Sequence, residues 1–470
     1  MPTNFPTTPA LEFDARLLAR YDVAGPRYTS YPTAPSFRDD FGEREYRTFT
    51  RETNDDPIPS ALSIYVHVPF CESPCFYCGC TRLVTRNHEN ADRYLDHLEQ
   101  EIALQSALFD ADRSVVQLHL GGGTPNFLSI EELTRLTGSL ARGFSLDRGD
   151  DRDFSIEIDP RYVVPGLMDA LASLGFNRVS LGVQDFDPAV QEAVNRIQPE
   201  EETRAVVEAA RAAGMRSVNL DLIYGLPKQH PDSFARTLQS VVSLRPDRIA
   251  LCAYAHLPER FKAQRRIQAA DLPPPGVKLA LLGLAIRELT EAGYCYVGMD
   301  HFALPGDPLA RAFTGGTLHR NFQGYSTHGE CDLVGLGMSA IGHVGGCYSQ
   351  NARDLASYYE HVAAGRLPIV RGIALEFDDI LRADLIQSVM CRNRLDFAAV
   401  ERRFGIRFDE YFTRELLELA RLADDGLVEL GARGFTVTPR GRLLLRVIAM
   451  VFDVSLRKRE APPPRFSRMI

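Results

Sequence analysis

The chain has 470 residues, 45% of them hydrophobic, which is enough for two or three domains with buried cores. Its formal net charge of −9 argues against a general nucleic-acid-binding protein, so we expect no nucleic-acid partner. The apolar stretch 443–456 is interrupted by Arg446 and Asp453 and is too short to span a bilayer. The first 21 residues show no signal-peptide pattern, and we expect a cytoplasmic protein.

In chain order, an irregular, proline-dotted N-terminal arm is expected over residues 1–50, and strand patterns then alternate with helix patterns. The expected strands cover 62–68, 115–120, 154–158, 178–183, 217–222 and 248–253, and expected helices cover 91–109, 131–143, 166–174 and 201–213. Repeated strand–helix–strand units predict a parallel sheet. Six units before about residue 260 favour a barrel or partial barrel, and no G-x-G-x-x-G fingerprint supports a Rossmann sheet.

Polar residues alternate with apolar residues along four of these strands. The polar members are Ser63, Tyr65, His67, Ser155, Glu157, Asp159, Ser180, Gly182, Gln184, Asn219 and Asp221. Alternation with a period of two places the two sets on opposite faces of the sheet. Outer helices need the apolar face, so the polar set is predicted to face a barrel interior, near the strand ends where barrel enzymes build their sites. An ordinary half-exposed sheet would show the same alternation.

Cys71, Cys75 and Cys78 follow the first strand with the spacing C-x3-C-x2-C, and Cys80 comes two residues later. Thiolates are the usual ligands of a 4Fe–4S cluster, and three of them leave one iron open for a small molecule. Zinc is the alternative, although zinc sites usually separate two C-x2-C pairs by a dozen or more residues. A disulfide framework fits poorly, because the chain has nine cysteines and no export signal.

A glycine run, Gly121-Gly-Gly-Thr-Pro125, follows the second strand. Glycine permits close backbone approach to a ligand, and the exposed N–H groups can bind it. The run lacks the G-K-[ST] ending of a P-loop, and tight turns also use consecutive glycines. Beside the cysteine loop it indicates a cofactor cradle.

Past residue 375 the pattern becomes mainly helical. Two short strands flank a turn at 431–434, and a helix capped by Thr438 with Pro439 at its first position is expected next, as in a winged-helix-like unit. Such units often bind DNA, but the acidic chain favours an architectural or lid role. The basic tail from Arg457 to Arg468 is either a solvated arm or a clamp for anionic groups.

The cysteine spacing and the glycine run resemble the radical S-adenosylmethionine (radical SAM) superfamily. Longer strings resemble its oxygen-independent coproporphyrinogen III oxidases, over nearly the whole chain; they are 26–33, 65–71, 78–80, 180–186, 221–227, 298–303 and 319–325. The resemblance implies an α/β fold: a partial (β/α)6 radical SAM barrel over 51–375, after an N-terminal arm over 1–50. A mainly helical, winged-helix-like domain would follow over 376–470.

The resemblance also implies ligands for one 4Fe–4S cluster and two S-adenosylmethionine molecules. Cys71, Cys75 and Cys78 would hold three irons, and the amine and carboxylate of the first S-adenosylmethionine would chelate the fourth. The first molecule would contact Tyr65, Gly122, Glu157 and Ile341. The second would contact Tyr77, Gly123, Thr124, Gln184, Arg196, Asp221 and Ala255. The family carries an aromatic residue at the position of Tyr77, and tyrosine is a mild difference there. Arg196 alone would also fit an ordinary surface position.

The implied reaction converts the ring A and B propionates of coproporphyrinogen III to vinyl groups through a 5′-deoxyadenosyl radical. It needs an electron donor and an electron acceptor, and the family resemblance suggests a monomer. The implied catalytic residues are Tyr65, Cys80, Glu157, Phe322 and Gln323; Phe322 and Gln323 also fit a core position and a turn. Cys80 is expected near the substrate and not as a fourth ligand. The alternative is a related haem-binding or haem-delivery protein without oxidase activity, disfavoured by Cys80, the arm and 319–325.

Overall fold

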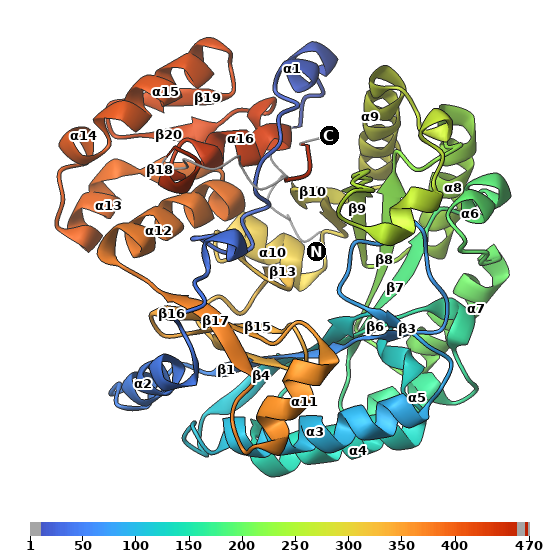
Figure 1. The fold of residues 1–470 in the computed structure, drawn as a ribbon. Coiled ribbons are helices and arrows are strands. Elements are labelled where there is room, and N and C mark those ends of the chain that lie inside the picture. Colours follow the sequence, from blue (N-terminus) through green and yellow to red (C-terminus); the bar gives the residue numbers. More distant parts are fainter. Residues whose placement is uncertain (1–10, 458–465, 469–470) are drawn as a thin grey trace, which may run out of the picture.

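Six parallel strands form the centre of the computed structural model, which describes residues 11–457 and 466–468 (Figure 1). In spatial order they are β1 (Leu62–Val68), β4 (Ser114–Gly122), β6 (Asp153–Ile158), β7 (Arg178–Gln184), β8 (Ser217–Tyr224) and β9 (Arg248–Ala253). All neighbouring pairs run parallel, as the sequence predicts, and each strand begins and ends within two residues of its expected bounds.

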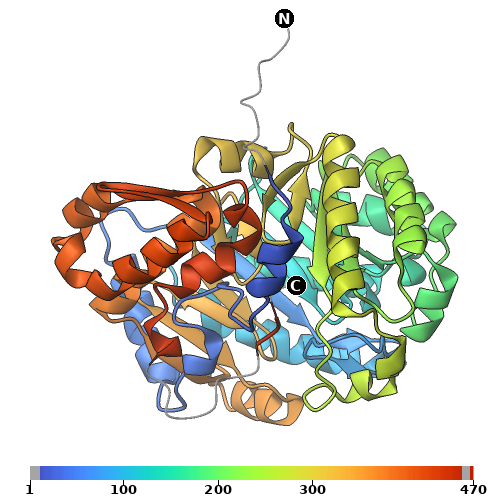
Figure 2. The ribbon, with the colours of Figure 1, turned by 90° about the horizontal axis from the view of Figure 1, so that it is seen from above.

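Helices cover the outer face of these strands, as Figures 1 and 2 show. They are α3 (Glu89–Ser106), α4 (Ile130–Gly143), α5 (Leu167–Ser173), α6 (Pro188–Ala193), α7 (Glu200–Ala212), α8 (Pro231–Leu244) and α9 (Pro275–Glu291). The apolar strand residues, such as Ile64, Ile156 and Leu220, are fully buried beneath them. The polar set faces inward, where a cavity of about 190 Å³ is lined by Ser155, Glu157, Ser180, Asn219 and Asp221 among others. The predicted polar interior is therefore confirmed.

The sheet continues beyond the six strands at both edges. Next to β1 come β14 (Asp332–Leu336), β15 (Ile341–Val344), β16 (Cys347–Asn351) and β17 (Ile369–Ala374), and next to β9 come β11 (His301–Ala303) and β10 (Cys295–Gly298). Within the described residues the end strands β10 and β17 do not pair with each other, so the barrel is partial and open. No helix among these residues is both long enough and apolar enough to cross a bilayer.

The N-terminal arm is more regular than expected. It contains α1 (Ala15–Arg20) and the twelve-residue helix α2 (Glu43–Asn54). The N–H of Gly42 donates to the Glu45 carboxylate at 3.0 Å, which caps α2 in the manner of a capping box. Tyr46, Thr50 and Thr53 are buried on one face of this helix. Residue 50 lies inside α2, and the division of the chain into three parts at 50 and 375 stays a prediction.

The C-terminal part is mainly helical, as predicted, and lies to one side of the barrel in Figures 1 and 2. It consists of α12 (Phe377–Arg392), β18 (Arg394–Asp396), α13 (Phe397–Phe404), α14 (Phe408–Tyr411), α15 (Thr413–Asp424), β19 (Val428–Gly431), β20 (Gly434–Val437) and α16 (Leu445–Met450). Its three strands form one sheet in the order β18-β20-β19, and β18 is a strand that the sequence did not predict.

The expected helix start at Pro439 is wrong. The Thr438 hydroxyl does accept the Gly441 N–H at 3.1 Å, but only a 3-10 turn over Gly441–Leu444 follows, and α16 begins at Leu445. Gly441 packs so closely on the Leu427 carbonyl that a side chain would not fit, which fixes the backbone in this turn.

Much of the basic tail, including Lys458, Arg459 and Arg465, lies outside the described residues. Arg457, at one border of that gap, is mostly buried, whereas the Arg468 side chain is 68% exposed. Arg457 pairs with Glu415 at 2.9 Å, and Arg468 pairs with Asp22 at 2.7 Å.

A buried carboxylate, Glu101 on α3, holds the segment that follows β14, the strand beside β1 in the sheet. It accepts hydrogen bonds from the Gly337 N–H at 2.8 Å, from Asn351 at 2.7 Å and from the Tyr358 hydroxyl at 2.6 Å. The neighbouring Tyr94 hydroxyl donates to the backbone carbonyl of His67, four residues before Cys71, at 2.7 Å. The strand that leads into the cysteine loop is thus held from its outer side.

We expect Glu101→Gln to flatten the pH dependence of stability. Burial raises the pKa of Glu101 to about 7, although its three hydrogen bonds oppose the shift. The unfolded carboxyl titrates at about 4.3, so the stabilisation is complete below that pH and is lost as pH rises through 7. The loss is about 4 kcal/mol, and glutamine, being neutral, should not show it. Urea unfolding between pH 5 and 8 measures this slope. The exposed Glu89→Gln on the same helix is the control, and an unchanged slope in Glu101→Gln would contradict the assignment.

Candidate cofactor and active site

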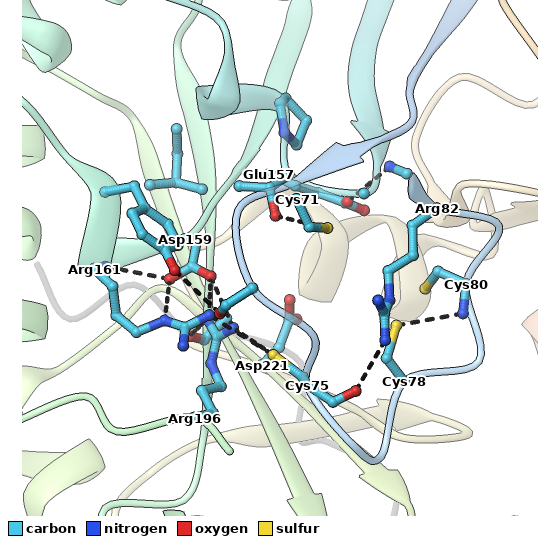
Figure 3. A pocket seen from close by; sticks show the side chains of 18 of the residues that line it. Cys71, Cys75, Cys78, Cys80, Arg82, Glu157, Asp159, Arg161, Arg196 and Asp221 are labelled. Carbon is cyan, nitrogen blue, oxygen red and sulfur yellow. Dashed lines mark hydrogen bonds and ion pairs between the residues drawn. The ribbon is translucent and has the colours of Figure 1, made fainter. Parts of the chain in front are cut away.

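A cavity of about 230 Å³ lies at the carboxyl ends of the parallel strands, beside the cysteine loop (Figure 3). The structure brings to it most of the residues singled out in the sequence: Cys71, Cys75, Tyr77, Cys78, Cys80, Gly122, Gly123, Thr124, Glu157, Gln184, Arg196 and Asp221. These residues come from β1, β4, β6, β7 and β8 and the segments that follow them. Convergence at one sheet edge is what parallel strands provide.

The cysteine loop is closed by a short parallel pair, β2 (Phe70–Cys71) with β3 (Leu83–Val84). Inside the loop the Cys78 N–H donates to the Cys75 carbonyl at 3.3 Å, and the Cys80 N–H donates to the Cys78 sulfur at 3.4 Å. Hydrogen bonding from Cys80 lowers the pKa of the Cys78 thiol to about 5, with Arg82 acting in the same direction. The Thr124 hydroxyl donates to the Cys71 sulfur at 3.2 Å.

Two arginines flank the Cys75 sulfur, and both are held by Asp159 (Figure 3). The Asp159 carboxylate pairs with Arg161 at 2.7 Å and with Arg196 at 2.9 Å. Arg196 Nη1 lies 3.5 Å and Arg161 Nη2 lies 3.7 Å from Cys75 Sγ. Burial would raise the pKa of Asp159, but the two guanidinium groups outweigh it and hold the pKa below its usual range. Arg196 is buried, so its surface interpretation is wrong.

The glycine run forms one wall of the cavity. Only glycine fits at two of its positions, because a side chain there would meet neighbouring atoms. Gly122 has φ of +115°, and a Cβ on it would lie 2.5 Å from the His67 ring. A Cβ on Gly123 would lie 2.7 Å from the Phe70 carbonyl oxygen, directly before Cys71. The Gly123 N–H donates to the Val68 carbonyl at 2.8 Å. The run therefore lies directly against the strand end that carries the first cysteine.

Glu157 links the glycine run to the barrel interior. Its carboxylate accepts the Gly122 N–H at 3.1 Å and lies 3.4 Å from His119 Nε2. Burial raises its pKa, but these hydrogen bonds outweigh burial and keep the pKa below the usual value. The His119 ring stacks on Tyr65 with centroids 5.9 Å apart, and the Tyr65 hydroxyl bonds His67 Nδ1 at 3.0 Å. Tyr65 and Glu157 thus belong to one polar row.

Asp221 and Gln184 line the opposite side of the cavity. Asp221 accepts hydrogen bonds from Asn219 at 2.7 Å and from Ser180 at 3.1 Å. Burial, together with the charge of Glu157, raises the pKa of Asp221 to about 6. Gln184 ends β7 with φ of +69°, at a register shift between β7 and β8. This rare backbone conformation turns the strand end toward the cavity.

Five predicted residues do not line this cavity, and one of them is Tyr65, which stacks on His119 as described above. Ala255 lines a neighbouring cavity, and Gln323 lines the interior one, 3.5 Å from the Ser63 hydroxyl. Phe322 packs edge-on against Tyr348 with centroids 6.0 Å apart. Ile341 lies on β15, beyond β14 in the sheet, and does not line the cysteine cavity. The proposed roles of these residues stay predictions.

His119 and Arg161 belong to the site but are missing from the residues predicted for it, whereas Asp159 is among the polar residues predicted to face the interior, without an assigned role. His119 alternates with Leu118 and Leu120 on the second strand, and this alternation is the signal that could have found it. Asp159 shows the same pattern on the third strand. Arg161 has no such signal, because only the fold places it beside Cys75.

The donor set fits an iron–sulfur cluster. Three thiols from one short loop line a cavity, and the neighbouring wall is glycine backbone. Among the described residues, no three thiol, imidazole or carboxylate groups converge on one point, as a mononuclear zinc site would require. The thiolates of a 4Fe–4S cluster bind different irons and need no common point.

Comparison with known proteins gives a consistent result. The Radical SAM superfamily model matches residues 65–241, and the HemN C-terminal domain model matches residues 375–444. Oxygen-independent coproporphyrinogen III oxidases are similar over the full chain: the Pseudomonas aeruginosa protein is 50% identical over 98% of this chain and 99% of its own, and the Escherichia coli protein is 49% identical over the same shares. The Synechocystis protein is 42% identical over 100% of both chains. The solved structure of E. coli coproporphyrinogen III oxidase (HemN), described as a radical SAM enzyme, matches with a TM-score of 0.90 and 47% identity, covering 95% of this chain and 100% of its own.

We expect Gly123→Ala to lower the iron and sulfide bound per chain after anaerobic reconstitution. The added methyl group would press on the Phe70 carbonyl and displace Cys71. Gly276→Ala, where a Cβ meets no atom within 4 Å, is the matched control and should retain both. Iron and sulfide assays measure the effect. Equal content in the two variants would show that the close approach of Gly123 does not position the loop.

Proposed function

The chain belongs to the radical SAM superfamily and, within it, to the family of oxygen-independent coproporphyrinogen III oxidases, and we therefore propose that it converts coproporphyrinogen III to protoporphyrinogen IX. The observation that carries this proposal is full-length similarity together with the three-thiol loop facing a glycine-walled cavity. The enzyme is an oxidoreductase of haem biosynthesis.

The reaction removes a hydrogen atom from the β-carbon of a propionate, after which carbon dioxide leaves, one electron passes to an acceptor and a vinyl group remains. It runs once on ring A and once on ring B. When bound, the cluster and S-adenosylmethionine supply the radical chemistry, while the protein orients the groups and excludes water. We propose that a separate donor and a separate acceptor exchange the electrons, and that the protein works as a cytoplasmic monomer.

We propose that Cys71, Cys75 and Cys78 each bind one iron. The position of all three beside one cavity supports this set. Arg161 and Arg196 donate toward the Cys75 sulfur, and hydrogen bonds to ligand sulfurs tune the potential of such clusters. Cys80 also lines the cavity, and we assign it to the substrate side and not to the cluster.

We propose two S-adenosylmethionine sites around this loop. Glu157 is ionised at neutral pH, because its hydrogen bonds keep its pKa low, and it can accept hydrogen bonds from hydroxyl or ammonium groups of the first molecule. Tyr65, Gly122 and Ile341 complete the proposed first site. The second would use Tyr77, Gly123, Thr124, Gln184, Arg196, Asp221 and Ala255. The common cavity of most of these residues supports the assignment.

The test of function is anaerobic reconstitution with iron and sulfide, followed by incubation with reductant, S-adenosylmethionine and coproporphyrinogen III. We expect protoporphyrinogen IX, methionine and 5′-deoxyadenosine by mass spectrometry. Cys75→Ser should abolish all three products, because one iron loses its ligand. Reconstituted protein that binds haem but forms no divinyl product would instead point to the haem-delivery function.

The ligand count has its own test. Cys80→Ser should retain the iron and sulfide of the wild type, because we assign no iron to Cys80. It should lose turnover, because we assign Cys80 to the substrate side of the cavity. Cys78→Ser should lose iron. Iron analysis and electron paramagnetic resonance of the reduced proteins compare the two variants. Equal iron loss in both would make Cys80 a ligand and end the three-ligand assignment.

A further inference from the structure

A second cavity, of about 290 Å³, lies beside the cysteine cavity at the carboxyl ends of β8 and β9. Its walls come from Gly225 after β8, from the segment 253–257 after β9, from Lys278 on α9 and from the described tail residues Phe466, Ser467 and Arg468. We refer to it as the Lys278 cavity. It occupies the same edge of the barrel as the cofactor site, where ligands of such folds bind.

Lys278 is a cation at this cavity without a counter-ion among the described residues. Its ammonium donates to the Tyr254 carbonyl at 2.8 Å, and no carboxylate of the described residues lies within ion-pair distance. Asp22 is the carboxylate that acts electrostatically on Lys278, and it forms an ion pair with Arg468 at 2.7 Å. Burial lowers the pKa of Lys278 to about 8, with Arg468 acting in the same direction. A desolvated cation with unused donors binds a carboxylate strongly.

The position of Lys278 is fixed by its surroundings. Gly225 has φ of +84°, and a Cβ there would lie 2.7 Å from the Lys278 Cε atom. The lysine stem thus runs across a glycine, which directs the ammonium to the cavity wall. The nearby His256 is held by the Tyr254 hydroxyl at 2.9 Å, and burial lowers its pKa, so it adds no positive charge at neutral pH.

The Lys278 cavity is connected to the proposed second cofactor site. The Gln264 amide donates to the Ala255 carbonyl at 3.1 Å and to the Tyr77 carbonyl at 2.9 Å, which joins its wall to the cysteine loop. At about 290 Å³ the cavity is at the small end of ligand pockets, too small for a tetrapyrrole but suited to a carboxylate-bearing side chain.

We propose that Lys278 and its cavity form a carboxylate-binding subsite of the oxidase. The carboxylate is either a propionate of coproporphyrinogen III that is not under attack, or the methionyl carboxylate of a second S-adenosylmethionine. This proposal rests on the proposed function. It names a residue that orients the substrate or cofactor and does not take part in the bond-breaking steps.

The test compares Lys278→Gln, which removes the charge, with Lys278→Arg, which keeps it, in the reconstituted enzyme. The exposed Lys262→Gln is the matched control. The probes are coproporphyrin III and its tetramethyl ester, followed by fluorescence in one detergent buffer, and S-adenosylhomocysteine, followed by calorimetry. A charge-assisted hydrogen bond predicts a roughly tenfold loss of affinity in Lys278→Gln. The ratio between the Gln and Arg variants isolates charge from any loss of packing, and thermal melting checks the fold.

If Lys278→Gln binds coproporphyrin III more weakly than the wild type but binds the tetramethyl ester equally well, the carboxylate is a substrate propionate. If only the affinity for S-adenosylhomocysteine falls, the carboxylate belongs to the cofactor. If neither ligand distinguishes Gln from Arg, or if Lys262→Gln behaves as Lys278→Gln does, the subsite is overturned. A wild-type enzyme that forms no protoporphyrinogen IX would defeat the proposed function, whereas the affinity ratios would still decide the subsite.

Discussion

The cysteine loop depends on one buried carboxylate, Asp159, which compensates two arginines beside the Cys75 sulfur. A buried guanidinium is costly unless it is paired and hydrogen-bonded, so neither Arg161 nor Arg196 could lie there without Asp159. Asp159 follows β6, and Arg196 also donates to the Gly182 carbonyl on β7 at 2.6 Å. The ion network therefore ties two strand ends to the loop. A shift of either strand would move the charges that surround the sulfur, which makes the geometry of the loop a property of the whole sheet edge.

The same sheet gives two neighbouring carboxylates different acidities. Glu157 and Asp221 both face the cavity, and burial raises the pKa of each. Glu157 receives a backbone N–H and an imidazole, which outweigh burial, whereas Asp221 receives an amide and a hydroxyl and also feels the charge of Glu157. Glu157 is thus a permanent anion at neutral pH, suited to binding ribose hydroxyls or an ammonium. Asp221, with a pKa of about 6, is mostly ionised at neutral pH, and a positive ligand group near it would favour the ionised form further.

The six strands could be predicted because short apolar runs alternate with helix patterns along the chain, and four of the runs also carry the polar alternation of a sheet between helices and a polar interior. The cysteine loop could be recognised from spacing, since its thiols are close in the sequence, whereas the choice of three ligands rests on the family resemblance and stays a proposal. Contacts between residues far apart in the sequence were harder to predict. Arg196 fits an amphipathic stretch, and only the fold shows that it is buried against Asp159. Helix α2 was missed because its signal is a capping interaction and a polar stripe, not an apolar one. The late start of α16 depends on the contact between Gly441 and Leu427, which no local pattern records.

The sizes of the cavities constrain how a tetrapyrrole can bind. The cysteine cavity measures about 230 Å³ and the Lys278 cavity about 290 Å³, so neither holds the macrocycle. A tetrapyrrole would therefore place at most single side chains in either cavity. Gln264 joins the walls of the two cavities through its hydrogen bonds to the Tyr77 and Ala255 carbonyls. Anchoring one carboxylate at a cation while another side chain faces the cofactor fixes the orientation of the ring, which is the positional control that a reaction on chosen propionates requires.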